Sequence, residues 1–148
     1  MKIQKAKITD LKDIIPWISN EQACKMWAGS HVKFPLIVKE LSKDIEFSDD
    51  NSYCYKKDAS IFAFGQLLAK EKGCLHLARI IVNPIRRGKG YGRLLCSELI
   101  HLATQKDSQK ISLNVYKSNV SAFKLYKNLG FREVPEKSSQ DIHHMVKT

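Results

Sequence analysis

The segment RRGKGYG, at Arg86–Gly92, restricts the fold of this chain more than any other stretch of its sequence. It follows an apolar, β-branched run that ends at Val82, and it precedes a stretch in which apolar residues recur at helical spacing. We therefore expect a strand, a glycine turn and a helix in that order. Glycine adopts backbone conformations that other residues avoid, and exposed amides at the start of a helix attract anions. Together with the cationic side chains of the segment, these features predict a turn that binds phosphate groups.

Three phosphate-binding patterns can be compared with this turn. The P-loop pattern G-x-x-x-x-G-K-S/T has no match, and the dinucleotide pattern G-x-G-x-x-G fails because its last position falls on Arg93 or Leu95. The pattern R/Q-x-x-G-x-G/A matches Arg87–Gly92. For this match alone, a basic glycine turn without a ligand remains the alternative interpretation.

The periodicity of the chain predicts one α+β domain over residues 1–148, a length that fits a single domain. Strands are expected at residues 2–8, 52–56, 61–68, 74–82, 111–115, 131–134 and 143–146. Helices are expected at residues 9–18, 37–45, 91–103 and 119–129, and residues 20–37 are expected to be irregular. Asn119 is the expected cap of the last helix, and Gly130 follows the end of that helix.

Composition and charge exclude several classes of function. The formal charge of +10 suits a nucleic acid, an anionic surface or a polyanionic small ligand, but the lysines are dispersed, so we expect no nucleic-acid-binding stripe. No apolar run approaches the roughly 18 residues of a membrane span, and the N-terminus lacks a signal-peptide pattern. Four isolated cysteines without a C-x-x-C pair indicate reduced thiols in a cytoplasmic protein and no metal site.

Two further segments extend the pattern around the turn. Upstream lies LARIIVNP, at residues 77–84. Downstream, the segment LNVYKSNVSAFKLYKNLGF, at residues 113–131, fits the signature L-x-V-x-x-x-N-x-x-A-x-x-L-Y-x-x-x-G-F. The matching positions are Leu113, Val115, Asn119, Ala122, Leu125, Tyr126, Gly130 and Phe131. Together with the turn, these segments resemble the GNAT superfamily of acyltransferases.

The resemblance implies the three-layer α/β/α fold of that family. Its central sheet would be mixed, mostly antiparallel and strongly twisted, with six to seven strands, about four flanking helices and a splay between the fourth and fifth strands. Acetyl-CoA is the implied co-substrate, with its pyrophosphate on the glycine turn and its pantetheine arm along the central strand. The implied cofactor-binding residues are Ile80, Ile81, Val82, Arg87, Gly88, Lys89, Gly90, Tyr91, Gly92, Asn119 and Ala122.

Tyr126 is the candidate general acid. Acyl transfer from a thioester expels a thiolate, which leaves more easily when a nearby acid delivers a proton, and a phenol can do so from hydrogen-bond distance. The matching tyrosine of the family lies beside the sulfur, so the resemblance implies this role for Tyr126. Helical spacing alone would make Tyr126 a core aromatic that packs against the sheet, which is the alternative.

His76 is the candidate general base. Histone-type members of the family place a glutamate on the central strand, at the position that His76 occupies here. Members that acetylate ribosomal-protein N-termini place a glutamate in the fifth strand, where this chain has Asn114. Imidazole accepts a proton near neutral pH, either directly or through water, so His76 is suited to the role. A histidine at a strand end without a role is the alternative.

The acceptor itself is not identified by the sequence. Trp27, His31 and Phe34 lie in a segment that borders the acceptor groove in the family, although aromatic side chains there can equally fill the core. His143 and His144 are expected to be structural. The resemblance implies transfer of an acetyl group to a primary amine of a small molecule or protein, by direct attack in a ternary complex of a monomer or homodimer. A CoA-binding sensor or partner module that has lost catalysis is the alternative.

Overall fold

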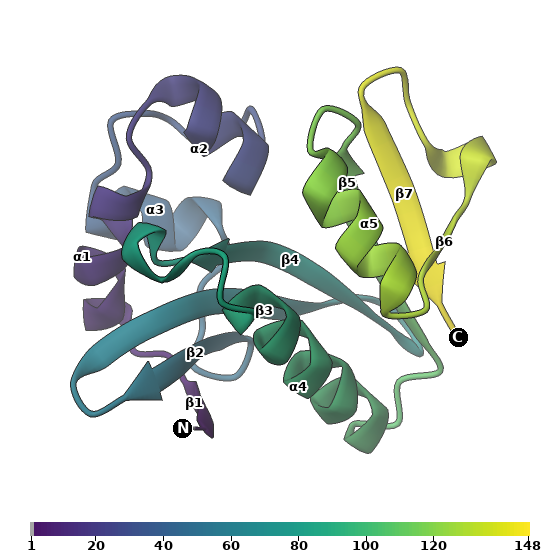
Figure 1. Cartoon of the computed structure of the whole chain (residues 1–148), viewed down its shortest axis with the longest axis horizontal. Helices are drawn as coiled ribbons and strands as arrows, with labels where there is room; N and C mark the ends of the chain where they lie inside the picture. Colours follow the sequence, from purple (N-terminus) through teal and green to yellow (C-terminus); the bar gives the residue numbers. More distant parts are fainter. Residues whose placement is uncertain (1) are drawn as a thin grey trace. The chain divides into compact units, whose positions relative to one another are not determined.

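A computed structural model describes residues 2–148 of the chain (Figure 1). Within these residues the strands are β1 (Lys2–Lys5), β2 (Ser52–Lys57), β3 (Ser60–Glu71), β4 (Cys74–Val82), β5 (Lys110–Tyr116), β6 (Arg132–Glu133) and β7 (Ile142–Lys147). The α-helices are α1 (Leu11–Ile14), α2 (Glu21–Ala28), α3 (Val38–Asp44), α4 (Tyr91–Gln105) and α5 (Val120–Asn128).

The strands form a 7-stranded sheet in the order β1-β2-β3-β4-β5-β7-β6. β2 pairs antiparallel with β1 and β3, β7 pairs antiparallel with β5 and β6, and β4 pairs parallel with β5. The parallel register joins Cys74–His76 to Lys110–Ser112, although β4 continues to Val82 and β5 to Tyr116. The expectation of a mixed sheet of six to seven strands is therefore confirmed.

Contacts divide the chain into two compact units. The first contains the residues up to Gln66 together with Arg79–Cys96, and the second contains Leu67–Ala78 together with Ser97–Thr148. Strands β3 and β4 and helix α4 therefore contribute residues to both units. The single domain expected over residues 1–148 stays a prediction.

The first unit has an apolar core beneath its short helices. Its fully buried side chains include Leu11 and Ile14 of α1, Leu41 of α3 and Phe64 of β3. Burying side chains of this size stabilises a fold by about 1.5–3 kcal/mol each. Helix α1 contacts α3, so the same apolar residues that gave the helical spacing also join these helices to the core.

Helix α2 corrects the expectation that residues 20–37 are irregular. The side chain of Asn20 accepts a hydrogen bond from the Ala23 N–H at 2.8 Å, which caps the first turn of this helix. Two other elements are shorter than expected. The first strand ends at Lys5 rather than residue 8, and the first helix ends at Ile14 because Pro16 continues it only as a 3-10 turn.

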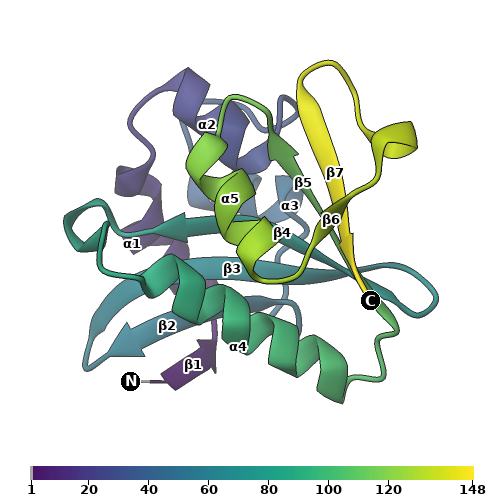
Figure 2. The ribbon, with the colours of Figure 1, turned by 45° about the vertical axis from the view of Figure 1, so that its right-hand side comes forward.

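The second unit packs α5 against its own strands. In Figure 1 α5 lies in front of β5, and in both views β7 runs beside β5 (Figures 1 and 2). Leu113 and Val115 of β5 are buried, as are Phe131 and Met145. Alternation along β5 places Ser112 and Asn114 on the opposite face from Leu113 and Val115.

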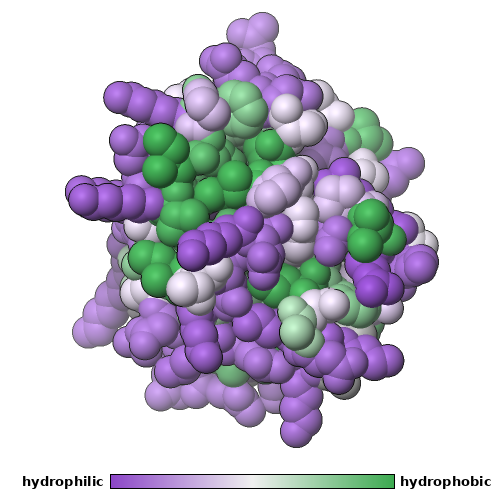
Figure 3. Space-filling model, turned by 90° about the vertical axis from the view of Figure 1, so that its left-hand side faces the viewer, coloured by the Kyte–Doolittle hydropathy of each residue, from purple (hydrophilic) through white to green (hydrophobic). Residues whose placement is uncertain are grey.

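Charged and apolar residues are mixed on the molecular surface. Figure 3 shows one face of the molecule, where hydrophilic side chains surround an apolar area. Within residues 2–148, no helix combines the length and apolar character that a bilayer crossing needs. The four cysteines, Cys24, Cys54, Cys74 and Cys96, are buried and unpaired with one another.

Candidate active site

The end of β4 is held in place by Asn83. Its backbone N–H donates to the Phe62 carbonyl oxygen at 2.8 Å, and its side-chain amide donates to the Ile61 carbonyl oxygen at 3.2 Å. The side-chain oxygen also accepts from the Ile85 N–H at 3.2 Å, so the same residue begins the following turn. The chain therefore leaves the sheet in a defined direction before it reaches the glycines.

The glycine turn adopts the backbone conformation that its sequence predicts. Gly88 has φ 77° and Gly90 has φ 86°, in the left-handed region that favours glycine. A Cβ atom added at either position would meet no heavy atom within 4 Å, so the turn borders open space. The Leu94 N–H donates to the Gly90 carbonyl oxygen at 3.0 Å as α4 begins. The preceding amides of Tyr91–Arg93 belong to the first helical turn, where N–H groups point outward and favour an anion.

The side chains of the turn fall into two groups. The Arg86 guanidinium lies 4.2 Å from the centroid of the Phe62 ring, and the Tyr91 ring meets Phe62 edge-on at 4.9 Å. Both residues are therefore engaged in packing. Arg87 is exposed and donates from Nε to the Val82 carbonyl oxygen at 3.3 Å, and Lys89 is also exposed. Arg87 and Lys89 are thus the cations of this turn that a phosphate in solvent can approach.

Strand β4 contains a residue in the left-handed conformation, Arg79, with φ 53°. A residue with a Cβ pays roughly 1–2 kcal/mol for this conformation. Two hydrogen bonds of the Arg79 guanidinium hold it, to the Gln66 side-chain oxygen at 2.9 Å and to the Ile45 carbonyl oxygen at 3.3 Å. Burial lowers the pKa of the Arg79 guanidinium, and Glu46 opposes that shift. This network distorts β4 directly before Ile80–Val82.

The structure places the aromatic candidates Trp27 and Phe34 against the core of the first unit. The Trp27 ring meets Phe64 at 6.3 Å between centroids, and its Nε1–H donates to the Arg79 carbonyl oxygen at 2.9 Å. Phe34 is partly buried against the same core. The third candidate, His31, is exposed, with Nε2 3.3 Å from the Asp44 carbonyl oxygen. A role for these residues in acceptor binding stays a prediction.

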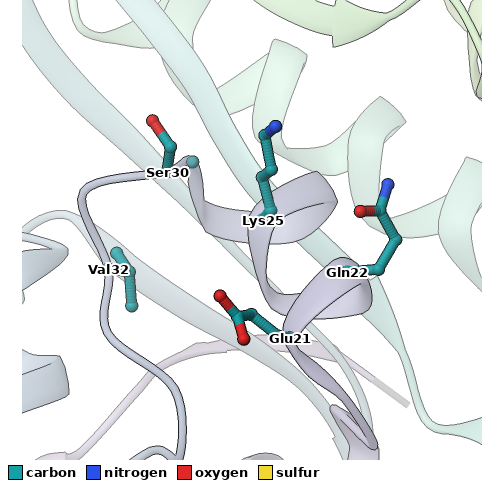
Figure 4. Close-up of a pocket in the computed structure, with 6 residues that line it drawn as sticks. Glu21, Gln22, Lys25, Ser30 and Val32 are labelled. Carbon is teal, nitrogen blue, oxygen red and sulfur yellow. The ribbon is translucent and has the colours of Figure 1, made fainter.

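A groove of about 520 Å³ lies along α2 in the first unit (Figure 4). It is lined by Glu21, Gln22, Lys25, Gly29, Ser30 and Val32. Figure 4 shows Gln22 and Lys25 projecting from α2, while Glu21 points toward the loop that carries Val32. The groove is therefore mostly hydrophilic, and the aromatic candidates Trp27 and Phe34 are not among its lining residues.

The Trp27 indole gives a first testable prediction. The substitution Trp27→Phe keeps an aromatic ring on the core but removes the donor to the Arg79 carbonyl, so we expect it to lower the free energy of unfolding by about 1 kcal/mol. If Ile80–Val82 bind acetyl-CoA, as the sequence resemblance implies, its KM should rise several-fold, because these residues follow the distorted Arg79. Urea denaturation and steady-state kinetics measure the two effects. Trp17→Phe makes the same change against the same core, and an equal rise in KM for both variants would contradict the prediction.

In the second unit, the end of α5 positions Tyr126. The Phe131 N–H donates to the Tyr126 carbonyl oxygen at 3.0 Å, and the Gly130 N–H donates to the Lys127 carbonyl oxygen at 3.0 Å. With Gly130 at φ 98°, these bonds form a Schellman motif. The rings of Tyr126 and Phe131 meet edge-on at 6.0 Å, the apolar contact that accompanies this motif. Tyr126 is 9% exposed and is therefore buried.

The start of α5 confirms the expected cap. The Asn119 side-chain oxygen accepts from the Ala122 N–H at 3.3 Å, and its backbone N–H donates to the Tyr116 carbonyl oxygen at 2.9 Å. Asn119 and Ala122, both implied to bind the cofactor, are thus joined in one turn at the beginning of the helix that carries Tyr126. Binding of pantetheine by these residues stays a prediction.

A second cavity, of about 280 Å³, lies wholly within the second unit. It is lined by Lys70, Glu71, Cys74, His76, Lys110, Ser112, Asn114, Lys137 and His144. The His76 Nδ1 lies 2.7 Å from the Ser112 hydroxyl, which orients the imidazole, and the His144 Nδ1 lies 2.7 Å from the Asn114 side-chain oxygen. His76 and Asn114, the two positions at which family members carry a glutamate, therefore line one cavity.

Several residues of this cavity were missed from the sequence. Lys110, Ser112 and Asn114 alternate along β5, a signal that places them on one face. His144 was expected to be structural but lines the cavity. The expectation fits His143, whose Nδ1 lies 2.6 Å from the Glu133 carboxylate and whose ring stacks on Phe123. The sequence alone does not show that β7 brings His144 beside Asn114.

Comparisons with known proteins agree on one family. The chain matches the model of the acetyltransferase (GNAT) family over residues 15–131. It is 26% identical over 109 residues to the spermine/spermidine N(1)-acetyltransferase of Bacillus subtilis (strain 168), covering 70% of this chain and 72% of that protein.

Two solved structures show the same fold. One is the PaiA N-acetyltransferase of Thermoplasma acidophilum in complex with coenzyme A, with a TM-score of 0.77 and 19% identity over 99% of this chain and 98% of that chain. The other is the spermidine N-acetyltransferase of Vibrio cholerae in complex with CoA and spermine, with a TM-score of 0.77 and 20% identity over 98% of this chain and 93% of that chain.

Proposed function

Since this chain belongs to the acetyltransferase (GNAT) family, we propose that it transfers an acetyl group from acetyl-CoA to a primary amine by direct attack in a ternary complex. The glycine turn between β4 and α4 is the observation that carries this proposal. Its left-handed glycines, the first turn of α4 and two exposed cations together provide the groups that a pyrophosphate needs. Family membership makes the diphosphate of CoA the expected ligand.

The proposed cofactor contacts follow the sequence resemblance. Arg87, Lys89 and the amides of Gly88–Gly92 bind the pyrophosphate, and Ile80–Val82 pair with the pantetheine arm. Asn119 and Ala122 bind the same arm from the start of α5. The distortion at Arg79 supports this proposal, because it alters the regular path of β4 directly before the backbone groups that would bind the arm.

The proposed reaction consists of deprotonation of the acceptor ammonium, attack of the amine on the thioester and departure of the CoA thiolate. The neutral amine attacks the thioester carbonyl carbon, and a tetrahedral oxyanion forms, stabilised by a backbone N–H of Ile81 or Val82. The carbon–sulfur bond then breaks, and the Tyr126 hydroxyl gives its proton to the departing CoA thiolate. Before the attack, His76 receives the proton that the acceptor ammonium must lose, directly or through water, and returns it to solvent. After the carbon–sulfur bond breaks, the new amide nitrogen loses its second proton to the Tyr126 phenolate, which restores the hydroxyl.

Three of the four cysteines, Cys24, Cys54 and Cys96, are poorly suited to form an acyl-cysteine intermediate, which favours direct transfer. Burial raises the pKa of the Cys54 and Cys96 thiols to about 12, so at neutral pH both stay protonated and are weak nucleophiles. Desolvation likewise raises the pKa of Cys24. We place the reaction in the cytoplasm, where thiols stay reduced. We also propose that the protein acts as a monomer or a homodimer.

The proposal is tested by pairing a binding measurement with a turnover assay. Titration calorimetry with acetyl-CoA should show binding, and a screen of lysine, N-terminal, polyamine, aminoglycoside and amino-acid acceptors should release CoA with at least one class. Binding without turnover on any acceptor would instead support the CoA-binding sensor or partner module. Failure to bind acetyl-CoA would refute both functions.

His76 gives a prediction specific to the base. The substitution His76→Gln is expected to lower kcat by about 10²-fold, because it removes a positioned proton acceptor, while the KM for acetyl-CoA changes little. Steady-state kinetics from pH 6 to pH 9 measure this effect. His101→Gln, on the exposed surface of α4, is the matched control and should retain full activity. An unchanged kcat for His76→Gln throughout this pH range would assign the proton to another acceptor.

A further inference from the structure

The cavity of the second unit carries an excess of positive charge. Three lysines line it, Lys70, Lys110 and Lys137, against one carboxylate, Glu71. That carboxylate is already engaged, because the Lys110 Nζ lies 3.3 Å from its Oε1. Within residues 2–148, the ion pairs include neither Lys70 nor Lys137. The cavity therefore retains positive charge that its own residues do not neutralise.

The positive charge also acts on the groups inside the cavity. The pKa of His144 is lowered by desolvation first, and then by the charges of Lys137 and Lys110. The walls add neutral hydrogen-bonding groups, the buried Ser112 hydroxyl and the exposed Asn114 side chain. Cationic groups around a partly enclosed polar surface provide a site for an anion.

Resting on the function proposed above, we propose that this cavity binds the negatively charged group of the acceptor, so that the preferred substrate is an amine that also carries a carboxylate. His76 lines the same cavity, and it is the proposed acceptor of the ammonium proton. A substrate with an amine toward His76 and a carboxylate toward the lysines would satisfy both kinds of group. A polyamine would instead place a second ammonium beside lysines, where like charges repel.

A preference for an anionic acceptor distinguishes this chain from a similar protein that acts on polyamines. The similar protein of Bacillus subtilis is a spermine/spermidine N(1)-acetyltransferase, so a polyamine is the obvious rival acceptor. The volume of about 280 Å³ limits the cavity to a small molecule or the end of a larger one. Charge, rather than size, distinguishes the two acceptors, and so the experiment compares acceptors of similar size that differ in the charge of one end.

The test uses three acceptors of equal chain length: 5-aminopentanoate, 5-aminopentanamide and 1,5-diaminopentane. We expect kcat/KM to be about 10-fold higher for the carboxylate than for the amide, and lower still for the diamine. High salt should reduce the advantage of the carboxylate, because exposed charges are screened. A higher kcat/KM for the diamine than for the carboxylate would overturn the proposal.

Variants connect this preference to the cavity. In the double variant Lys110→Gln/Lys137→Gln, the ratio of kcat/KM for carboxylate over amide should fall from about 10 to about 1. Lys57→Gln, which removes an exposed lysine at the end of β2, is the control and should leave the ratio unchanged. A ratio that survives the double variant would place the anion site elsewhere and overturn the assignment.

A binding measurement without turnover tests the anion site separately from the proposed acetyltransferase activity. Calorimetry with the CoA-bound protein measures the affinity for the carboxylate and for the diamine without any turnover. Tighter binding of the carboxylate, lost in the double variant, supports the cavity even if no acceptor is acetylated, in which case only the catalytic proposal fails. Tighter binding of the diamine, or binding of neither compound at millimolar concentration, would overturn the proposal that the cavity binds a carboxylate. The turnover assay would still decide whether the protein is an acetyltransferase.

Discussion

The variant Tyr126→Phe is expected to lower kcat by about 10²–10³-fold while the KM for acetyl-CoA changes by less than about 3-fold. The phenol is the proposed donor to the CoA thiolate, and phenylalanine keeps the ring that packs against Phe131 while removing only the hydroxyl. The Schellman motif at Gly130 depends on backbone groups, so the end of α5 should stay in place. Steady-state kinetics and a thermal melt measure the two consequences.

A matched control separates the loss of an acid from the loss of a hydroxyl. The Tyr53 hydroxyl donates to the Asp50 carbonyl oxygen at 3.1 Å in the first unit, so Tyr53→Phe removes one hydrogen bond and should cost about 1 kcal/mol of stability. Its kcat should be unchanged. The assignment also predicts that Tyr126→Phe loses less activity with thioesters whose thiol has a lower pKa. Full activity of Tyr126→Phe with acetyl-CoA would remove this tyrosine from the mechanism.

Local chemistry explains why much of the candidate site could be predicted from the sequence. The glycine turn, the cap at Asn119 and the stop at Gly130 each depend on a few neighbouring residues, whose side chains or left-handed backbone determine the conformation. The strand–turn–helix order around Val82 and Tyr91 depends only on periodicity. These features could therefore be predicted from the sequence without knowledge of the tertiary structure.

Features that depend on contacts distant in sequence were not predicted. The left-handed conformation of Arg79 needs Trp27, Ile45 and Gln66, none of which is near it in sequence. Helix α2 was missed although Asn20 is a common capping residue, because the irregular aromatic pattern that follows hid the helical spacing.

The cationic cavity is the clearest case of this limit. Its lining residues come from strands β3, β4, β5 and β7 and from the 3-10 turn Pro135–Lys137. The three lysines, Lys70, Lys110 and Lys137, come from β3, β5 and that turn. Sequence alternation indicates which residues of a single strand share a face, but strand order and register decide which strands are neighbours. The preference for an anionic acceptor is accordingly an inference that requires the structure.

The glycine turn gives the second large prediction. The double variant Gly88→Ala/Gly90→Ala is expected to weaken acetyl-CoA binding by about 30-fold or more, since each alanine pays about 1–2 kcal/mol in a left-handed conformation. Without ligand, the turn borders open space, so it can relax to another conformation and the loss of stability should be smaller than the loss of affinity. Binding requires the original conformation and must therefore pay the full cost.

Calorimetry with acetyl-CoA and urea denaturation measure these two quantities in parallel. Gly73→Ala is the matched control, because Gly73 also has a left-handed conformation, with φ 76°, but lies in the turn between β3 and β4. This variant should lose stability and keep its affinity for acetyl-CoA. The double variant should lose more affinity for acetyl-CoA than stability, because its strain is located where the pyrophosphate is proposed to bind. Equal losses of affinity in both variants would mean that the glycine turn has no special part in holding the cofactor.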